Sequence, residues 1–471
     1  MTHKKHPPTG PALTEFWDMP PADRVPLLLE AIAAAHAWHY PRNRAYREMV
    51  RSRGLGERLG GLEAGSPVLA RLLRPTAQTF KSYIGVIGTP FPQERPHAFL
   101  EWLADQLSLE LPRERFGHFR RRYPTLEKLL QDFEKVYADF GFQVTTSSGT
   151  SGRATIMVRD RETLDLAVTC FEQMTLALWQ VGGEHNAIFM MPRRTRIAMA
   201  RTARLGVERL GMDGRGRAHF TIPHAADPDR VRIRTGRTFR PGWRGEVEKR
   251  LLHPLARLVD ERWVQPRAVR ETITLLRRAE AAGEPTLLFG GWVHLHALAL
   301  ELQRRGYGQQ GRILRLAGGS LVGSGGGLKQ AYPYPPARIR RDIQRVLALA
   351  DGQPIPVRDV MGMAEANWAA PQCKEGNYHL PPWLYVVALD DDDRILDGPE
   401  VEGLLAFLDP LGGGSLFPSF FKTTDLVRLV NGSSGYDPER RCPCGRETPY
   451  LVEGTIRRVD LLEEAGCAGQ L

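Results

Sequence analysis

The sequence predicts an α/β fold in which mixed sheets are flanked by helices. Three observations point to it. Between Leu13 and Ala138, apolar residues recur at helical spacing. A run of Ser, Thr and Gly at residues 145–152 then separates two short apolar segments, which indicates strand, loop and strand. From Pro285 onward, apolar strands, glycine turns and a helix alternate, as they do in open α/β sheets.

The totals describe a globular chain. Its 471 residues can bury a large core. Lys and Arg (64) exceed Asp and Glu (54), which gives a net charge of +10, but no basic tract interleaved with aromatic residues stands out. A nucleotide, a pyrophosphate or an acidic partner explains this balance as well as nucleic acid does, so we expect no nucleic-acid partner. Five cysteines, an odd number, argue against a secreted disulfide scaffold. Without a signal-peptide pattern or a run of about 18 apolar residues, we expect a cytoplasmic protein with no membrane span.

The first quarter of the chain carries no obvious chemistry. Residues 1–12 are polar and proline-rich, and we expect them to be disordered. Helices are expected at 22–39, 98–109 and 125–138, with prolines punctuating the intervals. We therefore predict a mainly helical region at 1–128 that packs against a core at 129–455 and walls part of a substrate pocket. Residues 456–471 would form a hinge stub and a tail.

The run from Val144 to Arg153 offers the densest array of phosphate-binding groups. Its side chains are small, so its hydroxyl and backbone N–H groups are accessible to the oxygens of a triphosphate. Arg153 adds a cation. A Walker loop would instead end in Gly-Lys-Ser/Thr and enter a helix. A plain Ser- and Gly-rich hairpin is the alternative. The predicted phosphate contacts are Thr146, Ser147, Ser148, Gly149, Thr150, Ser151, Gly152 and Arg153.

The next elements follow from caps and periodicity. Asp160 is expected to cap a helix in which Cys170 is a buried small residue rather than a nucleophile. The arginines of 193–204 have two possible roles. One is to bind the phosphates of coenzyme A or an acidic carrier protein, and the other is to form a solvated face. Residues 215–250 are expected to be a surface excursion. A strand at 286–289, a helix at 293–305 and a strand at 312–316 follow. The last strand ends in Gly318-Gly319-Ser320, where open sheets bind ligands.

Four stretches, in this order, resemble one enzyme family. They are Ser147–Arg153, Gly318–Ser320, Val360–Glu365 and Phe421–Arg428. Together they resemble the adenylate-forming (AMP-binding) enzymes, in the branch that includes phenylacetate-CoA ligase and the acyl-protein synthetase of bacterial bioluminescence. The resemblance implies a large α/β N-terminal domain that uses ATP and Mg²⁺ to turn a fatty or aromatic carboxylic acid into an acyl-adenylate. A thiol then takes the acyl group.

The resemblance also implies roles for single residues. In the family, the loop matching Gly318, Gly319 and Ser320 lies against adenine, and the glutamate matching Glu365 holds Mg²⁺. Asp425 matches the aspartate that accepts both ribose hydroxyls, and Arg458 matches an arginine at the hinge. The remaining motif residues are Met361, which stands where many relatives have an aromatic residue, Gly362 and Met363. Read without the family, Glu365 is an exposed carboxylate at a helix start and Asp425 a polar residue at a strand start.

The cysteines give a separate signal. Cys373 and His379 are six residues apart, and Cys442 and Cys444 follow about 60 residues later. Three thiolates and an imidazole can hold structural zinc. Some phenylacetate-CoA ligase relatives carry a similar arrangement. The Cys-x-Cys spacing is tighter than that of a zinc finger, and four ordinary thiol and imidazole side chains are the alternative.

The C-terminal end departs from the family. Relatives continue into a small mobile domain bearing a lysine, whereas this sequence stops eleven residues after Asp460, so we expect that domain to be missing or supplied by a partner protein. The acyl-protein synthetases use a cysteine of their own near the C-terminus. Cys467 is placed for that role, although Glu463 and Glu464 would raise its pKa, and a bystander thiol is the alternative. The thiol acceptor is thus coenzyme A, a carrier or Cys467. A non-catalytic nucleotide-binding scaffold subunit of an acyl-transfer or reductase complex is the other function considered.

Overall fold

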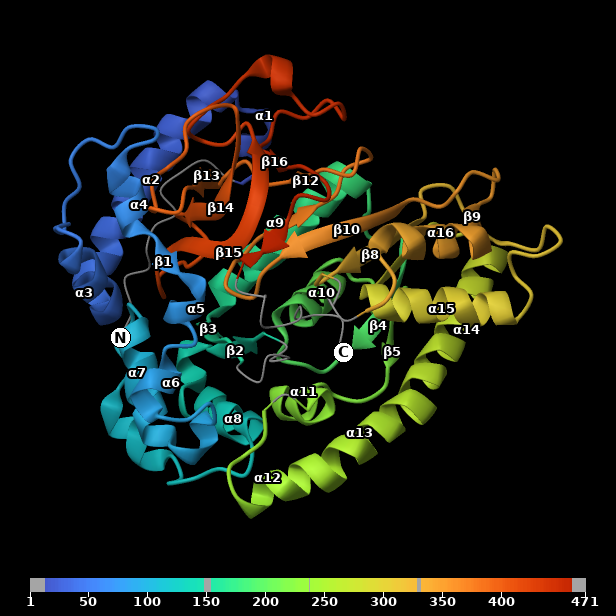
Figure 1. Cartoon of the computed structure of the whole chain (residues 1–471), viewed down its shortest axis with the longest axis horizontal. Coiled ribbons are helices and arrows are strands. Elements are labelled where there is room, and N and C mark those ends of the chain that lie inside the picture. Colours follow the sequence, from blue (N-terminus) through green and yellow to red (C-terminus); the bar gives the residue numbers. More distant parts are fainter. Residues whose placement is uncertain (1–12, 148–153, 237, 328–331, 460–471) are drawn as a thin grey trace.

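The computed structural model describes residues 13–147, 154–236, 238–327 and 332–459 (Figure 1). It is a mixed α/β fold with two large sheets and helices on their outer faces, which confirms the predicted fold class. Residues 1–12, which the sequence predicts to be disordered, lie outside the described residues. Within the described ranges, no helix combines the length and apolar character needed to cross a bilayer.

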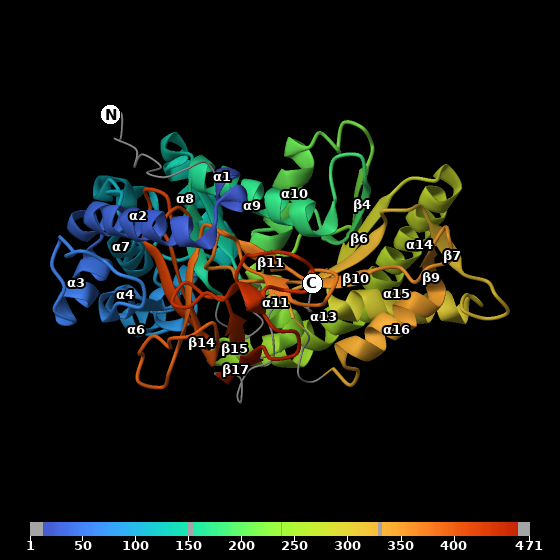
Figure 2. The same ribbon diagram turned by 90° about the horizontal axis from the view of Figure 1, so that it is seen from above.

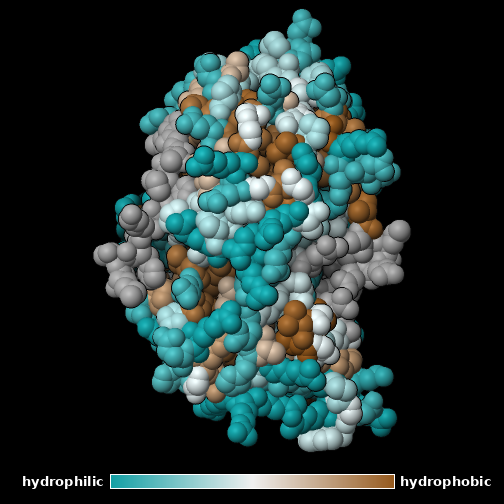
Figure 3. Space-filling model, turned by 90° about the vertical axis from the view of Figure 1, so that its left-hand side faces the viewer, coloured by the Kyte–Doolittle hydropathy of each residue, from teal (hydrophilic) through white to brown (hydrophobic). Residues whose placement is uncertain are grey.

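The N-terminal region is helical, as the periodicity predicts. The three predicted helices are found as α2 (Pro21–Arg42), α7 (Pro96–Gln106) and α8 (Leu126–Val136). Thr125 caps α8 by accepting a hydrogen bond from the Lys128 backbone N–H. Shorter helices complete the region: α1 (Glu15–Asp18), α3 (Arg44–Ser52), α4 (Pro67–Leu72), α5 (Thr76–Thr79) and α6 (Tyr83–Ile87). The face that they form is mostly hydrophilic, with hydrophobic side chains in separate patches (Figure 3).

This region is joined to the C-terminal sheet. Strand β1 (Arg74–Pro75) pairs in parallel with β15 (Ser419–Val430), and the buried Arg74 donates a hydrogen bond to the Pro418 carbonyl at 2.8 Å. One hydrophobic cluster runs from Phe16 to Leu451. The helices are therefore packed on the core that the rest of the chain builds.

A six-stranded sheet has the order β11-β10-β8-β6-β4-β5. Its strands are parallel except at the β11 edge. They are β4 (Asn186–Pro192), β5 (Ala218–Ile222), β6 (Thr286–Gly290), β8 (Leu321–Gly325), β10 (Val357–Gly362) and β11 (Ala369–Pro371). In β4, β6 and β8, alternate residues face two different clusters. One face carries α14 (Gln265–Ala282), α15 (Trp292–Arg304) and α16 (Pro336–Val346), and the other carries α9 (Arg161–Trp179) and α10 (Ala198–Arg209) (Figure 2).

One predicted strand belongs elsewhere. The strand expected at 312–316 forms as β7 (Leu314–Leu316), but it pairs with β9 (Leu347–Leu349) in a separate two-stranded sheet. The next strand of the large sheet is β8, whose glycines resemble a loop in the sequence. Packing requires them, because a Cβ at Gly323 would lie 2.7 Å from Phe289 and 2.9 Å from Trp179. Glycine here is thus a strand residue that admits aromatic neighbours.

The second large sheet has the order β12-β16-β15-β14-β13 and is antiparallel along that path. Its strands are β12 (Tyr378–His379), β13 (Tyr385–Leu389), β14 (Glu400–Asp409), β15 and β16 (Tyr450–Leu451), and β17 (Arg457–Arg458) also pairs with β15. The predicted strand, loop and strand are confirmed as a hairpin of β2 (Gln143–Thr146) and β3 (Ile156–Arg159). Asp160 caps α9 as predicted, and Cys170 is 2% exposed.

The arginines of 193–204 do not form one solvated face. Arg196 is buried and pairs with Glu127 at 2.9 Å and with Glu134, and Arg201 donates to the Val144 carbonyl at 2.9 Å. Glu127 and Glu134 belong to α8, so Arg196 fastens that helix beside β2. Arg196 and Arg201 have structural roles, because their guanidinium groups are already paired or hydrogen-bonded within the protein.

The predicted surface excursion contains a long helix. After α11 (Pro228–Thr235), the chain is helical without a break from Trp243 to Ala282. The successive parts are α12 (Trp243–Val247), the π-turn η4 (Glu248–Leu252), α13 (His253–Val259), the π-turn η5 (Asp260–Val264) and α14. It runs along the lower right edge of the molecule in Figure 1.

Candidate functional site

The base of the Ser/Thr/Gly loop lies at the carboxyl edge of the six-stranded sheet. The Ser147 N–H donates to the Thr155 carbonyl at 3.1 Å, and the Thr155 N–H donates to Ser147 Oγ at 2.9 Å, so the hairpin closes just below the loop. The buried Thr146 donates its N–H to the Arg196 carbonyl at 2.7 Å. Arg196 follows the carboxyl end of β4. The loop is thus anchored where open α/β sheets bind ligands.

Glu365 reaches the same place from the far end of the sequence. It lies in the turn between β10 and β11, four residues after Met361. Thr155 Oγ1 donates a hydrogen bond to Glu365 Oε1 at 2.7 Å. The alternative of a helix start is wrong, because residues 363–368 form a turn between two strands. A carboxylate therefore stands directly at the base of the hydroxyl-rich loop.

A buried arginine holds this turn in place. Arg159, the last residue of β3, donates to the carbonyls of Ala364 and Ala366, both at 3.2 Å. Desolvation lowers the pKa of Arg159 to about 10, opposed by Asp409 and Glu365. Burial raises the pKa of Asp409 to about 6, although the backbone N–H groups of Gly412 and Leu411 act against this rise. Arg159 thus grips the backbone on both sides of Glu365.

Sequence reasoning missed Arg159 and Thr155. Arg159 interrupts an apolar strand directly before the Asp160 cap, and a charged residue at the end of a buried strand is the signal that it offered. Thr155 lies two residues past Arg153, in a segment that the sequence marks only as a strand.

The proposed adenine loop at Gly318–Ser320 is misplaced. These residues precede β8, so they lie at the amino edge of the sheet. Ser320 Oγ accepts a hydrogen bond from the N–H of Thr286, the first residue of β6, at 2.9 Å, and His185, just before β4, is 3.4 Å from the Gly319 carbonyl. A five-residue strand is about 17 Å long, which separates this edge from Glu365. The prediction is wrong because β8 is rich in glycine and resembles a loop in the sequence. The residues before it therefore look like the end of a strand, although they precede one.

Glycines do occupy the correct edge. Strand β8 ends at Gly325, and Gly326 and Gly327 follow with φ of 88° and 69°, in the left-handed region that favours glycine. Met361 and Gly362 end the neighbouring β10, and Met363 opens the Glu365 turn. The motif residues of β10 therefore lie at the carboxyl edge of the sheet, beside this glycine turn.

Asp425 and Arg458 face each other. They are paired residues of β15 and β17, and the Arg458 Nε lies 3.9 Å from Asp425 Oδ1. The Asp425 side chain is 16% exposed, and its backbone N–H donates to Thr423 Oγ1 at 3.0 Å. Asp425 lies in the middle of β15 rather than at a strand start. An acceptor-only carboxylate, oriented by an arginine, is suited to bind two hydroxyls.

The rest of the loop, Ser148, Gly149, Thr150, Ser151, Gly152 and Arg153, lies outside the described residues, and so does Cys467. Their roles stay predictions.

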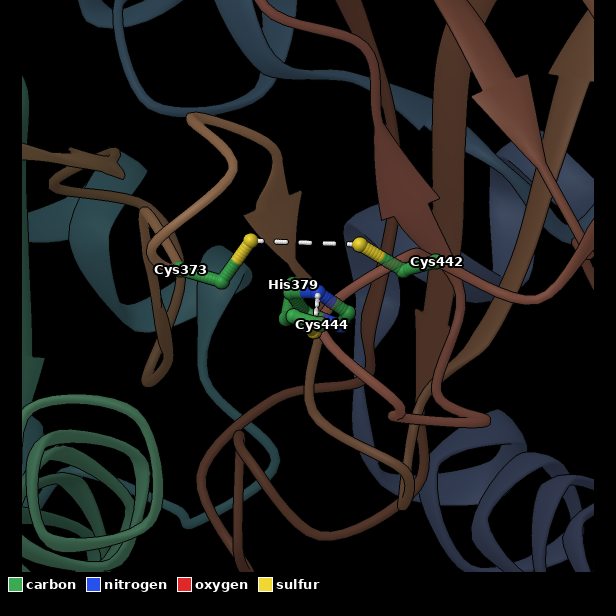
Figure 4. Close-up of side chains that lie close together, drawn as sticks. All are labelled: Cys373, His379, Cys442 and Cys444. Atoms are coloured by element: carbon green, nitrogen blue, oxygen red, sulfur yellow. Dashed lines mark hydrogen bonds between the residues drawn. The ribbon is translucent and has the colours of Figure 1, made fainter.

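The predicted metal ligands converge from three segments (Figure 4). Cys373 follows β11, His379 belongs to β12, and Cys442 and Cys444 precede β16. One ligand atom from each lies within 4.8 Å of all the others. Cys373 Sγ is 3.9 Å from Cys442 Sγ, and Cys444 Sγ is 3.3 Å from His379 Nε2. Tetrahedral zinc–thiolate bonds place two sulfurs about 3.8 Å apart, so the spacing of Cys373 and Cys442 is close to that of two thiolates on one zinc ion.

The surroundings of the cluster favour zinc ligation. His379 is fully buried, and its Nδ1 is hydrogen-bonded to Thr448 Oγ1 at 2.8 Å, which turns Nε2 toward the sulfurs. The hydrogen bond from the Cys373 thiol lowers the pKa of Cys442 below its usual range, and His379 acts in the same direction. All four described cysteines are free thiols. A thiolate and an oriented imidazole are what a zinc site needs.

Three comparisons with known proteins bear on the fold. No family model matches the sequence, and no curated protein matches it. Among solved structures, the chain is similar to an open conformation of 2-hydroxyisobutyryl-CoA ligase in complex with 2-HIB-AMP and CoA, with a TM-score of 0.50 and 13% identity over 95% of this chain and 78% of that one. The same ligase in its thioesterification state also has a TM-score of 0.50 and 13% identity, over 95% and 70% of the two chains. The chain therefore has the fold of the adenylate-forming (AMP-binding) ligases.

Proposed function

We propose that the chain is an AMP-forming acid–thiol ligase, which activates a small carboxylic acid with ATP and passes the acyl group to a thiol. The hydrogen bond between Thr155 and Glu365 carries this proposal. It places an acidic side chain against the base of a loop rich in hydroxyls and glycines, although the two residues are 210 positions apart. The fold shared with an acyl-CoA ligase supports the same reading.

The first step needs charge neutralisation more than covalent help. An oxygen of the substrate carboxylate forms a bond to the α-phosphorus of ATP, the bond from that phosphorus to the bridging oxygen breaks, and pyrophosphate leaves with the electron pair. The loop from Thr146 to Arg153 would donate hydrogen bonds to the phosphate oxygens. Asp425, oriented by Arg458, would accept the ribose hydroxyls, and Met361 would pack on adenine at the carboxyl edge.

The residues around Glu365 fit a magnesium ion. Mg²⁺ prefers hard oxygen ligands and is usually held by one or two carboxylates together with substrate phosphates. Glu365 supplies such a carboxylate, and the hydrogen bond from Thr155 fixes its orientation. When bound, the ion would supply positive charge to the phosphate oxygens. Arg159 would keep Glu365 in place by holding the backbone of its turn.

In the second step, a thiolate attacks the acyl carbonyl and AMP leaves. Coenzyme A, a carrier protein and Cys467 remain the proposed acceptors, and a partner protein would supply the mobile domain if the working enzyme needs one. We also propose that Cys373, His379, Cys442 and Cys444 hold structural zinc, which would tie β12 to the loop before β16.

Pyrophosphate exchange tests the function directly. Purified protein is incubated with Mg²⁺, ATP and labelled pyrophosphate in the presence of single fatty or aromatic acids. We expect label to enter ATP only when an accepted acid is present, because the adenylation step is reversible. Binding of ATP without exchange for any acid would contradict the proposal and favour a non-catalytic scaffold subunit.

Asp425→Asn should weaken ATP use through the ribose. A carboxylate that accepts two hydroxyls contributes about 1.5–3 kcal/mol, so we expect the KM for ATP to rise about tenfold or more with a smaller change in kcat. Wild-type protein should discriminate against 2′-deoxy-ATP, whereas Asp425→Asn should not. The exposed Asp397→Asn is the matched control. If Asp425→Asn kept both the wild-type KM and the discrimination, Asp425 would serve only as the ion-pair partner of Arg458.

A further inference from the structure

The helix that begins at Trp243 packs on the protein through its charged side. Arg232 and Glu248 form a buried ion pair with N–O distances of 2.9 Å, and Arg234 pairs with Asp260 at 3.0 Å. Between these pairs, His253 Nδ1 is hydrogen-bonded to the Ile233 carbonyl at 2.9 Å. All these contacts join the segment 243–264 to α11. A surface helix usually turns apolar residues toward the core, so this segment is inverted.

The outward side of the same segment is apolar. An apolar residue stands at every fourth position, and together with two leucines they form a set that we call the stripe: Trp243, Val247, Leu251, Leu252, Leu255, Leu258, Val259 and Trp263. Both tryptophans are 73% exposed, and Leu251 is 64% exposed. Single exposed apolar residues are ordinary, but a continuous exposed row of this length marks an interaction surface.

The π-turns keep the stripe on one side. An α-helix has 3.6 residues per turn, so a repeat of four residues drifts by about 40° at each step and would wind around the helix. The i→i+5 turns η4 and η5 rotate the chain less per residue and offset this drift. Both π-turns fall inside the segment that carries the stripe. The change in helical rotation at the two π-turns thus has the direction that keeps the apolar side chains on one side of the helix.

Cations border the stripe. In the segment 243–264, five Lys and Arg side chains are exposed, against two acidic ones. The exposed cations are Arg244, Lys249, Arg250, Arg257 and Arg262. The two exposed acids, Glu246 and Glu261, each pair with an arginine four residues away, whereas Glu248 and Asp260 are engaged by α11. The border of the stripe is therefore positively charged.

We propose that the stripe is a peripheral membrane-binding surface that seats the helix in the headgroup region of an anionic bilayer. Indole rings at both ends of an apolar row, with arginine and lysine beside it, are the chemistry that such an interface binds. The helix that carries the row lies along an outer edge of the molecule (Figure 1), and the side chains of the row are exposed. It would lie on the bilayer rather than cross it, because only one side of the helix is apolar.

Charge argues against a second copy of the chain as the occupant. Six of the eight stripe residues are arranged symmetrically about His253, so an antiparallel pair of helices would match Trp243 with Trp263. The same pairing would set Arg244 of one copy against Arg262 of the other, and Lys249 against Arg257. Like charges facing each other across an interface oppose association, whereas anionic lipids neutralise them.

Vesicle flotation with the full chain tests the proposal. We expect wild-type protein to float with vesicles of phosphatidylglycerol and phosphatidylcholine, less with phosphatidylcholine alone, and less again at high salt. The double variant Trp243→Ser and Trp263→Ser should lose about tenfold or more in vesicle affinity, since two indole rings no longer leave water. Its melting temperature should not fall, because both side chains are exposed.

A matched variant keeps the test specific. Val86 and Leu176 are 60% and 59% exposed outside the stripe, so Val86→Ser with Leu176→Ser should leave flotation unchanged. Lys249→Gln with Arg262→Gln should reduce flotation with the anionic vesicles only. The proposal is overturned if wild-type protein does not float, or if the tryptophan variant floats equally well. A dimer in light scattering that the tryptophan variant breaks, without vesicle binding, would assign the stripe to a second copy.

Discussion

Glu365→Gln should lower pyrophosphate exchange into ATP by about a hundredfold or more. Glutamine preserves the volume of the side chain and can still accept the hydrogen bond from Thr155, but it removes the negative charge that would hold Mg²⁺. Losing one preorganised charge at a phosphoryl transfer site typically lowers kcat by about 10²–10³-fold. Exchange is measured at saturating ATP over a Mg²⁺ titration, and the optimum should move to higher Mg²⁺.

Two controls separate this loss from misfolding. Glu375→Gln changes an exposed carboxylate in the turn that follows β11 and should exchange at the wild-type rate. The melting temperature of Glu365→Gln should stay close to that of wild type, because the side chain is only partly buried. Wild-type exchange by Glu365→Gln would show that Glu365 is a structural partner of Thr155 and nothing more.

Removal of zinc should cost the protein at least about 3 kcal/mol of unfolding free energy. The four ligands link strand β12 to the loop before β16. Without the ion they would lose the centre that joins them, and only the hydrogen bonds of His379 to Thr448 and of Cys442 to Asn377 would remain beside their contacts with one another. We expect one equivalent of zinc in protein purified without chelators, and a lower melting temperature after treatment with a strong chelator. Cys442→Ser should show both effects.

Cys170→Ser is the matched control, since Cys170 is also a buried thiol but lies in α9, outside the cluster. It should keep its zinc whatever it does to stability. Less than about half an equivalent of zinc in the wild-type protein would rule out the site. Zinc content is measured on the metal itself, so this result does not depend on catalytic activity.

The sequence predicts best where chemistry and spacing agree. The hairpin around the Ser/Thr/Gly loop, the cap at Asp160 and the convergence of Cys373 and His379 with Cys442 and Cys444 are all found in the structure. Each depends on residue types with narrow uses, such as a capping carboxylate or a thiol beside an imidazole. The pairing of Asp425 with Arg458 is harder to predict from the sequence, because it depends on the register of β15 and β17.

The sequence predicts less well where long-range packing decides. Gly323 and Gly325 look like loop residues. In the strand, however, a Cβ at Gly323 would clash with Phe289 and Trp179, and Met199 leaves little room at Gly325. Arg159 and Arg196 look like surface cations, yet both are buried by segments distant in sequence. The helix from Trp243 is harder still, since its apolar side faces water and its polar side faces α11. Periodicity identifies such a helix but assigns its faces the wrong way round.

The parallel pair of β1 and β15 has a consequence for synthesis on the ribosome. Arg74 is registered with Phe421, so an early segment must wait until nearly the whole polypeptide has emerged before it finds its neighbour. Contacts of such wide sequence separation slow folding and prolong the exposure of apolar surface on nascent helices. Newly made chains should therefore depend on chaperones until residue 421 has left the exit tunnel, and N-terminal fragments made alone should aggregate.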